Sequence, residues 1–251
     1  MPARTYDDEV FKEKRRPKNP ITFKLKLNEE QKIAKQTILL NTITLLAGKA
    51  GSGKTLLACQ VALDGLFRRD YEKIIITRPT VSKEEIGFLP GDLHAKMDPW
   101  VQPIYQNMYS LYGKDKIQPY IESGQIEIVP VSFMRGRTFV GSCVIVDEAQ
   151  NVTNDQMEMI VTRVGINSKM IICGDDGQVD LKGRGESGFR FLYNQSSKIK
   201  NLSSITLLQN HRDPIVDDLI EIYEEENYKD QIKINKYGDS KKRKSITSVY
   251  S

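Results

Sequence analysis

The chain has 251 residues with 39% hydrophobic content, which is enough for one large domain with a buried core. Its two histidines and three widely spaced cysteines argue against a histidine-based metal site and a disulfide framework, and its net charge of +4 is too small to identify a partner. The sequence shows no apolar signal core and no run of transmembrane length, so we expect a cytoplasmic protein without a membrane partner.

Basic clusters lie near both ends of the chain, in segments without apolar periodicity. One cluster is Lys12–Lys18, within residues 1–20, and the other is Lys241–Lys244, within residues 236–251. We expect flexible basic tails on either side of a single domain at 21–235. Two interpretations stay open: the tails are solvated and disordered, or they contact phosphate backbones without sequence specificity.

Between the tails, short apolar runs alternate with longer amphipathic stretches. The short runs predict strands at 42–47, 73–77, 126–130, 143–147, 170–173 and 204–208. The amphipathic stretches predict helices at 28–39, 55–67, 98–112, 155–164, 188–194 and 214–225. Several strands are continuous runs of Ile and Val, as expected for strands buried on both faces. The alternation therefore predicts an α/β fold, with a mostly parallel sheet between two layers of helices.

The first predicted helix opens with Asn28-Glu29-Glu30-Gln31. This is a capping sequence, in which the Asn28 and Gln31 side chains can satisfy each other's backbone groups. Gln31 can also present a paired donor and acceptor to an adenine edge. The two roles are compatible, so Gln31 is a candidate nucleotide contact.

The segment Gly48–Thr55 fills the phosphate-loop template between a predicted strand and a predicted helix. Its glycines let backbone N–H groups turn inward around phosphate oxygens. Lys54 can reach the β- and γ-phosphates, and the Thr55 hydroxyl can ligate Mg²⁺. A plain glycine-rich turn is the competing interpretation, but the flanking strand and helix favour the phosphate loop. The expected nucleotide contacts are Gln31, Gly48, Ala50, Gly51, Ser52, Gly53, Lys54, Thr55 and Leu56.

Three later strands end in residues suited to phosphate chemistry, and ligands of open α/β sheets collect at such strand ends. Asp147 would hold the Mg²⁺ shell, and Glu148 would orient and deprotonate the attacking water; helix capping is their alternative role. Gln178 could hydrogen-bond the γ-phosphate, although a surface turn would look similar. Arg212 could neutralise charge on the transferred phosphoryl group, or simply flank a helix.

Taken in order, these motifs resemble the PhoH family of P-loop ATPases, whose domain is similar to the first motor domain of superfamily-one helicases. The resemblance spans about residues 21–223 and also rests on Thr77–Val81, Gly87–Leu93, Ser132–Thr138 and Asp147–Asn151. It implies a RecA-like sheet, ATP and Mg²⁺, and it assigns the site residues the roles given above. One departure is Asp213, where the family usually has histidine. The chain resembles compact, phage-type members without a fused nuclease domain, so a bacterium or a phage-infected host cell is the expected setting.

The helicase resemblance also implies where a polynucleotide would touch the protein. Thr77 and Arg78 take the place of one helicase contact segment, and Phe133, Arg135 and Arg137 take the place of another. An exposed aromatic ring beside arginines can stack bases while the cations hold phosphates. The alternatives are that Phe133 belongs to the core and that Arg137 braces the acidic pair.

The leading functional hypothesis is an ATPase that moves on or remodels RNA or single-stranded DNA. Conventional helicases clamp ATP between two RecA-like domains, and one is expected here, so we expect a homo-oligomer, such as a ring. The rival hypothesis is a nucleotide-dependent switch that binds protein partners without translocation. A small-molecule kinase is a third possibility, but a glutamate placed to activate water suits hydrolysis better.

Overall fold

The computed structural model describes residues 26–79, 93–175, 186–216 and 218–223, with only the backbone given at 93–101. Gln178 and both basic tails lie outside these residues. The chain divides after Asn210 into two units. The second unit includes Arg212, and the domain boundary that we expected at residue 235 stays a prediction.

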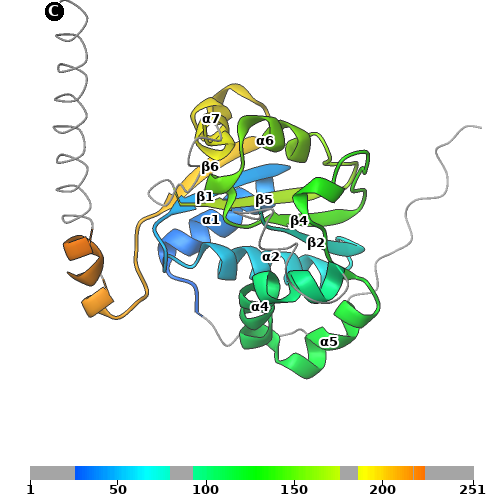
Figure 1. The fold of residues 1–251 in the computed structure, drawn as a ribbon, viewed down its shortest axis with the longest axis horizontal. Helices are drawn as coiled ribbons and strands as arrows, with labels where there is room; N and C mark the ends of the chain where they lie inside the picture. Colours follow the sequence, from blue (N-terminus) through cyan, green and yellow to red (C-terminus); the bar gives the residue numbers. More distant parts are fainter. Residues whose placement is uncertain (1–25, 80–92, 176–185, 217, 224–251) are drawn as a thin grey trace, which may run out of the picture. The chain divides into compact units, whose positions relative to one another are not determined.

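Six strands form one parallel sheet in the first unit, in the order β3-β2-β4-β5-β1-β6 (Figure 1). The strands are β1 (Ile43–Gly48), β2 (Lys73–Thr77), β3 (Ile126–Ile128), β4 (Ser142–Val146), β5 (Lys169–Gly174) and β6 (Leu202–Leu207). The predicted strands are confirmed, with ends displaced by at most two residues. Because all pairs are parallel, every strand presents its carboxyl end at the same edge of the sheet.

Helices cover both faces of the sheet and create two cores (Figure 1). One face carries α1 (Glu29–Leu40), α2 (Lys54–Phe67), α4 (Leu93–Tyr112) and α5 (Lys114–Glu122), and the other carries α6 (Asn154–Val161) and α7 (Gly188–Gln195). Successive strand residues alternate between the cores: Ile74 and Ile76 join the first and Ile75 joins the second. All three cysteines, Cys59, Cys143 and Cys173, are buried in the first core.

Helix α5 was not predicted from the sequence, because Pro119 lies inside it and most of its residues are polar. It forms through packing: Ile117 is fully buried in the first core, and Tyr120 and Ile121 pack against that core. Tertiary contacts therefore override a weak local propensity. Within the described ranges there are also three short 3₁₀ turns, at Val131–Phe133, Ala149–Asn151 and Ser196–Lys198.

Helix α1 is fixed at its C-terminal end by a buried lysine. The Lys169 ammonium, at the start of β5, donates to the carbonyls of Ile38 (2.6 Å), Leu39 (3.2 Å) and Asn41. These carbonyls lie at the negative end of the helix dipole, where a cation is favoured. Burial lowers the pKa of Lys169, so this cation is costly to keep charged and is compensated by its three acceptors.

At its N-terminal end, α1 is joined to the carboxyl end of β6. The predicted capping box is present, since Asn28 Oδ1 accepts from Gln31 N (2.7 Å) and Gln31 Oε1 accepts from Asn28 N (3.2 Å). The Glu30 carboxylate accepts from the N–H groups of Leu208 (2.6 Å) and Gln209 (3.2 Å). Gln31 therefore lies at the sheet edge where the strands end.

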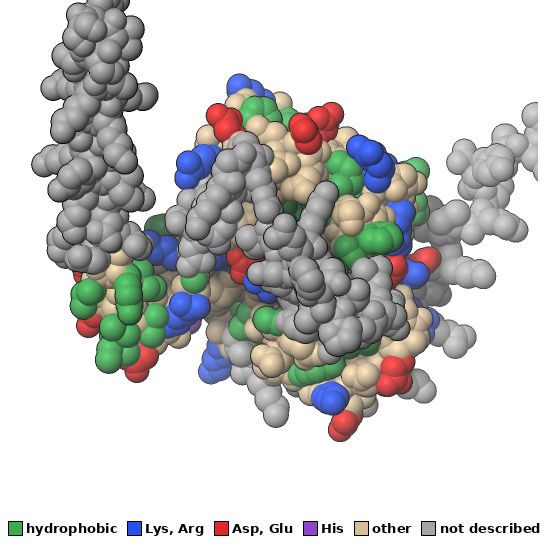
Figure 2. All heavy atoms as spheres, viewed as in Figure 1, with side chains coloured by type: hydrophobic (Ala, Val, Ile, Leu, Met, Phe, Trp, Pro, Cys, Tyr) green, Lys and Arg blue, Asp and Glu red, His purple; other side chains and the backbone are tan. Residues whose placement is uncertain are grey.

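The second unit contributes a helical segment at 214–216 and 218–223. Four large apolar side chains in it are exposed: Ile215, Leu219, Ile222 and Tyr223. Their spacing puts them on one side of a helix, and Figure 2 shows apolar side chains gathered on this segment. Among the helices that the structure describes, none combines the length and apolarity needed to cross a membrane.

Candidate nucleotide-binding site

The phosphate loop joins β1 to α2 and depends on glycine backbone geometry. Gly51 (φ 90°) and Gly53 (φ 84°) lie in the left-handed region, which side chains disfavour. Gly53 is also the N-cap of α2 and supplies no side-chain cap. The first N–H groups of a 14-residue helix therefore face the loop, where the positive end of the helix dipole favours an anion.

Two polar groups of the loop are arranged as a phosphate would require. The Ser52 hydroxyl is buried and has no hydrogen-bond partner within the described part of the chain, a condition that costs about 1–3 kcal/mol. The Lys54 ammonium donates to the loop's own carbonyls, Gly48 O (2.6 Å) and Lys49 O (2.9 Å). A polyphosphate bound in the loop could accept hydrogen bonds from both the Ser52 hydroxyl and the Lys54 ammonium, so the two groups fit such a ligand.

The loop is connected to the acidic end of β4 by one hydrogen bond. The Thr55 hydroxyl donates to Asp147 Oδ1 at 2.8 Å, across the end of β5, which lies between β1 and β4. Burial raises the pKa of Asp147 above its usual 3.8; the Thr55 hydrogen bond opposes this shift and the Glu148 charge adds to it. A hydroxyl beside a buried carboxylate is a donor set that suits Mg²⁺, so Thr55 and Asp147 fit the predicted metal ligands.

The carboxylate of Glu148 is held from two sides. One oxygen, Oε2, accepts from Gln150 Nε2 at 2.7 Å, and Oε1 faces Arg78 Nη2 at 3.3 Å. Gln150 is 1% exposed, and its own oxygen accepts from the backbone N–H of Asp175, just past β5, at 3.0 Å. Glu148 has a left-handed backbone (φ 51°), a conformation that costs energy in a residue other than glycine and is common at functional sites.

Gln150 was not predicted as a site residue. Its only sequence signal is its place in the acidic segment that follows β4. The contact with Asp175 depends on β4 and β5 being neighbours in the sheet.

Among the other expected nucleotide contacts, Gln31 is buried and uses its side-chain oxygen in the capping box. Leu56 is half-buried and packs against the first core. Gln178 lies outside the described residues, and Arg212 belongs to the second unit. The roles expected of Gln31, Gln178 and Arg212 at the nucleotide stay predictions.

The residues expected to touch a polynucleotide fall into different environments. Thr77 is fully buried and its carbonyl accepts from Asp147 N (2.9 Å), and its expected contact with a polynucleotide stays a prediction. Phe133 is 56% exposed, which rules out the core position that was its alternative. Arg135 is exposed as well, while Met134 between them is buried and anchors the segment.

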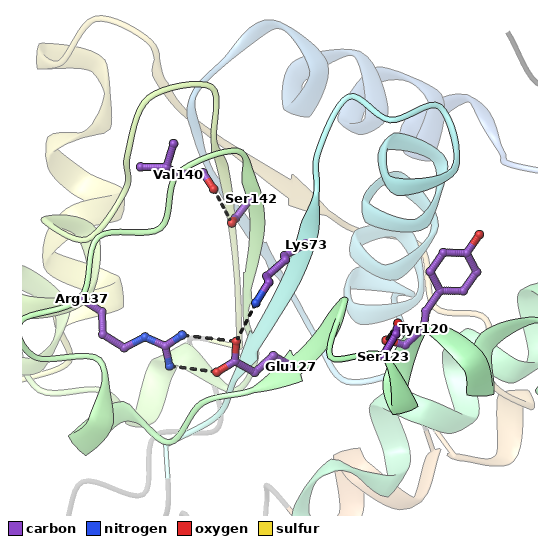
Figure 3. Close-up of polar contacts among 7 residues, drawn as sticks. All are labelled: Lys73, Tyr120, Ser123, Glu127, Arg137, Val140 and Ser142. Atoms are coloured by element: carbon purple, nitrogen blue, oxygen red, sulfur yellow. Dashed lines mark hydrogen bonds and ion pairs between the residues drawn. The ribbon is translucent and has the colours of Figure 1, made fainter. Parts of the chain in front are cut away.

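Arg137 is held in a structural ion pair. Its guanidinium donates to both Glu127 oxygens, at 3.0 and 3.3 Å (Figure 3). It also lies 5.0 Å from the centre of the Phe139 ring. Lys73 approaches the same glutamate at 3.9 Å. Arg137 therefore does brace a carboxylate, but the carboxylate belongs to β3 and not to the acidic pair that follows β4.

The comparison with known proteins identifies the family. Residues 25–224 match the family described as PhoH-like protein. The chain belongs to the PhoH-like family. Its sequence is 40% identical over 192 residues to a PhoH-like protein of Synechocystis sp. and 43% identical over 190 residues to one of Bacillus subtilis. These matches cover 75% and 74% of this chain but 58% and 60% of the relatives, so the chain spans about three-fifths of their length.

Membership of the PhoH-like family confirms the resemblance inferred from the motifs. It agrees with the parallel sheet order and the phosphate loop, which together confirm the expected three-layer, RecA-like P-loop fold. Among solved structures, the Pif1 helicase from Candida albicans is similar at 18% identity and a TM-score of 0.42, over 78% of this chain and 43% of the helicase.

Proposed function

We propose that this PhoH-like chain is a Mg²⁺-dependent ATPase that couples hydrolysis to movement on, or remodelling of, RNA or single-stranded DNA. The observation that carries the proposal is the 2.8 Å hydrogen bond between Thr55 and Asp147. This bond joins the phosphate loop to the acidic end of β4, where Glu148 directly follows Asp147. A phosphate site, a metal site and a base for water are thereby adjacent.

In the proposed reaction, the loop N–H groups bind the phosphates and Lys54 turns from its two carbonyl partners toward the β- and γ-phosphates. Thr55 and Asp147 would hold Mg²⁺, which neutralises phosphate charge when bound. Glu148 orients a water and takes its proton as the water oxygen bonds to the γ-phosphorus. The bond from that phosphorus to the β-phosphate oxygen breaks, which gives ADP and inorganic phosphate.

Polynucleotide contact is proposed for Phe133 and Arg135, with Arg78 beside them. Phe133 and Arg135 are exposed on the segment that follows β3, where an aromatic ring can stack a base and a guanidinium can hold a phosphate. Val129 N donates to Ile76 O (2.8 Å), so this segment leaves the sheet beside the one that carries Arg78.

We also propose that the chain acts as a homo-oligomer. The exposed apolar side chains of residues 214–223 favour a protein contact. Light scattering with and without an ATP analogue tests this, and a strict monomer that hydrolyses ATP rapidly would contradict it. The same apolar side chains also support the second candidate function, a nucleotide-dependent switch that binds other proteins.

The deciding experiment is the ATPase rate titrated separately with single-stranded RNA, single-stranded DNA and duplex, at several salt concentrations. We expect one of the single-stranded polymers to raise the rate, with an effect that weakens as salt rises. Lys54→Ala is the control for the site and should lose turnover. If no polymer changes the wild-type rate, the motor is excluded and the switch becomes the better account.

A further inference from the structure

We infer that the exposed apolar face of residues 214–223 binds a second copy of this chain, at the edge of the sheet where the strands begin. The inference rests on the homo-oligomer proposed above and names the two surfaces that would form it. Neither surface contains a residue of the nucleotide site, so we expect the copies to associate without ATP.

The receiving surface is an apolar row along the amino edge, which is the edge at which the parallel strands begin. Four side chains in the turns before β4, β5, β1 and β6 form the row, with exposed fractions of 59%, 77%, 79% and 47%: Val140, Ile166, Leu40 and Ile199. Single apolar residues are common on protein surfaces, but a group of neighbouring ones is typical of a contact with another protein.

Backbone hydrogen bonds place the four turns of the apolar row side by side. Gly141 N donates to Ile166 O (3.0 Å), which joins the turn before β4 to the turn before β5. Thr42, just before β1, accepts from Met170 N (2.8 Å) and donates to Asn201 O (2.9 Å), which joins the starts of β5, β1 and β6. Neighbouring strands lie about 4.8 Å apart, so the row crosses three strand spacings and is about 14 Å long.

The apolar face of the helical segment has a similar length. Its four exposed side chains are Ile215, Leu219, Ile222 and Tyr223. A helix rises about 1.5 Å per residue, so this face is about 12 Å long from end to end. The helix laid across the strand ends can therefore cover the whole apolar row with its apolar face.

The charges beside the two surfaces have opposite signs. Lys198 and Lys200 are exposed on either side of Ile199, at the β6 end of the apolar row. The helical residues that the structure describes include two exposed acids, Asp218 and Glu221, and no cation. Opposite charges around an apolar contact steer association and fix its direction. An acidic amphipathic helix is therefore a partner whose chemistry fits this edge of the sheet.

The other end of the apolar row is less suited to the acids of the helix. Glu72 lies beside it, since the Glu72 N–H donates to Gly141 O (2.7 Å), in the turn before β4. The carboxylates of the helix should therefore lie toward β6, where the lysines are.

The contact between two different surfaces is heterologous. Each copy offers its helical segment to one neighbour and its apolar row to another. Repeated contacts of this kind close into a ring when the rotation between copies closes, and otherwise extend as a filament.

The test measures the mass of the full chain by light scattering and sedimentation velocity, without nucleotide and over a range of concentrations. Ile166→Asp puts a charge in the apolar row, and Leu219→Asp puts one on the helix face. Each should raise the dissociation constant of the oligomer by about 10–100-fold. Leu208→Asp is the matched control, because Leu208 is 83% exposed at the opposite end of β6, and this variant should associate as wild type does.

Mixing the two variants tests the direction of the contact. Ile166→Asp keeps an intact helix and Leu219→Asp keeps an intact row, so the mixture should form a 1:1 dimer and nothing larger. Reversal of one charge pair gives an independent check: Lys200→Glu and Glu221→Lys should each weaken association, and the chain that carries both should recover part of it. If circular dichroism shows that Leu219→Asp is unfolded, Glu221→Lys takes its place in the mixture.

The possible results separate the inference from the proposals on which it rests. If wild type associates and both aspartate variants associate equally well, the two surfaces are wrong while the homo-oligomer stands. If each variant is monomeric alone but the mixture forms no dimer, the head-to-tail contact is overturned. A wild type that stays monomeric at every concentration, with and without an ATP analogue, overturns the homo-oligomer as well. The ATPase rate of the same samples tests the enzymatic proposal separately.

Discussion

Two arginine–glutamate pairs lie at neighbouring parts of the sheet and show how the same residue types serve different purposes. Arg137 holds Glu127 through two hydrogen bonds and packs on an aromatic ring. Arg78 touches Glu148 at one point, and that glutamate has a second, closer partner in Gln150. The first pair is joined by a two-point contact, whereas the second glutamate is shared between an arginine and a buried amide next to Asp147.

The largest expected effect comes from changing Glu148, the glutamate that follows Asp147. Glu148→Gln keeps the shape and the contact with Gln150 but removes the group that accepts the proton. We expect kcat to fall by about 10²–10⁴-fold with ATP binding retained. Steady-state ATPase assays and titration with a fluorescent ATP analogue measure the two quantities. Glu127→Gln is the matched control, because Glu127 is the glutamate of the pair with Arg137. A comparable loss of kcat in this variant would show that the two glutamates do not differ in function.

A smaller kinetic effect is expected from Gln150→Leu, which removes the firm partner of Glu148. The variant loses the 2.7 Å bond to the carboxylate and leaves the Asp175 N–H without its acceptor. We expect kcat to fall about tenfold while KM stays near its wild-type value, because the carboxylate is misdirected and not removed. An unchanged kcat would show that Arg78 alone positions Glu148.

Breaking the ion pair between Arg137 and Glu127 should lower the stability of the fold and leave ATP binding unchanged. Arg137→Ala removes two hydrogen bonds and the contact with Phe139, but the pair is partly exposed, so we expect a loss of about 1–2 kcal/mol in the free energy of unfolding. Urea denaturation followed by circular dichroism measures the loss. A stable Arg137→Ala variant with weakened RNA binding would instead return Arg137 to the polynucleotide surface.

The smallest effect concerns Asp147, a carboxylate held by neither arginine pair. Its pKa is raised in the folded state, so the buried charged form costs stability at neutral pH, and the cost disappears as pH falls through the raised pKa. Asp147→Asn should therefore be more stable than wild type at pH 8 without nucleotide or Mg²⁺. The difference should shrink as pH falls toward 4 in parallel unfolding curves, and a constant difference would contradict the stated cause.

Much of the fold follows from local sequence, because each strand is a short apolar run and Gly48–Thr55 has one common structural context. Local sequence did not reveal what lies beside a residue in space. Thr77 and Arg78 were expected to share one role, yet one is buried in the sheet and the other faces Glu148. Arg137 was expected at the polynucleotide from its place in a helicase-like segment, with the acidic pair as its alternative partner, and no local pattern indicated its contact with Glu127 of β3. The contact between Gln150 and Asp175 forms because β4 and β5 are neighbours in the sheet. Apolar periodicity predicts each strand separately and does not predict the order of the strands.

The burial of all three cysteines in one core gives the protein a built-in reporter. Cys59, Cys143 and Cys173 are each 0% exposed, and burial raises the pKa of Cys143 to about 12, so the folded thiols are shielded and protonated. An alkylating reagent meets them only in molecules that have opened around α2 and the strands beneath it. The rate of cysteine labelling therefore measures how often this layer separates, without an engineered probe.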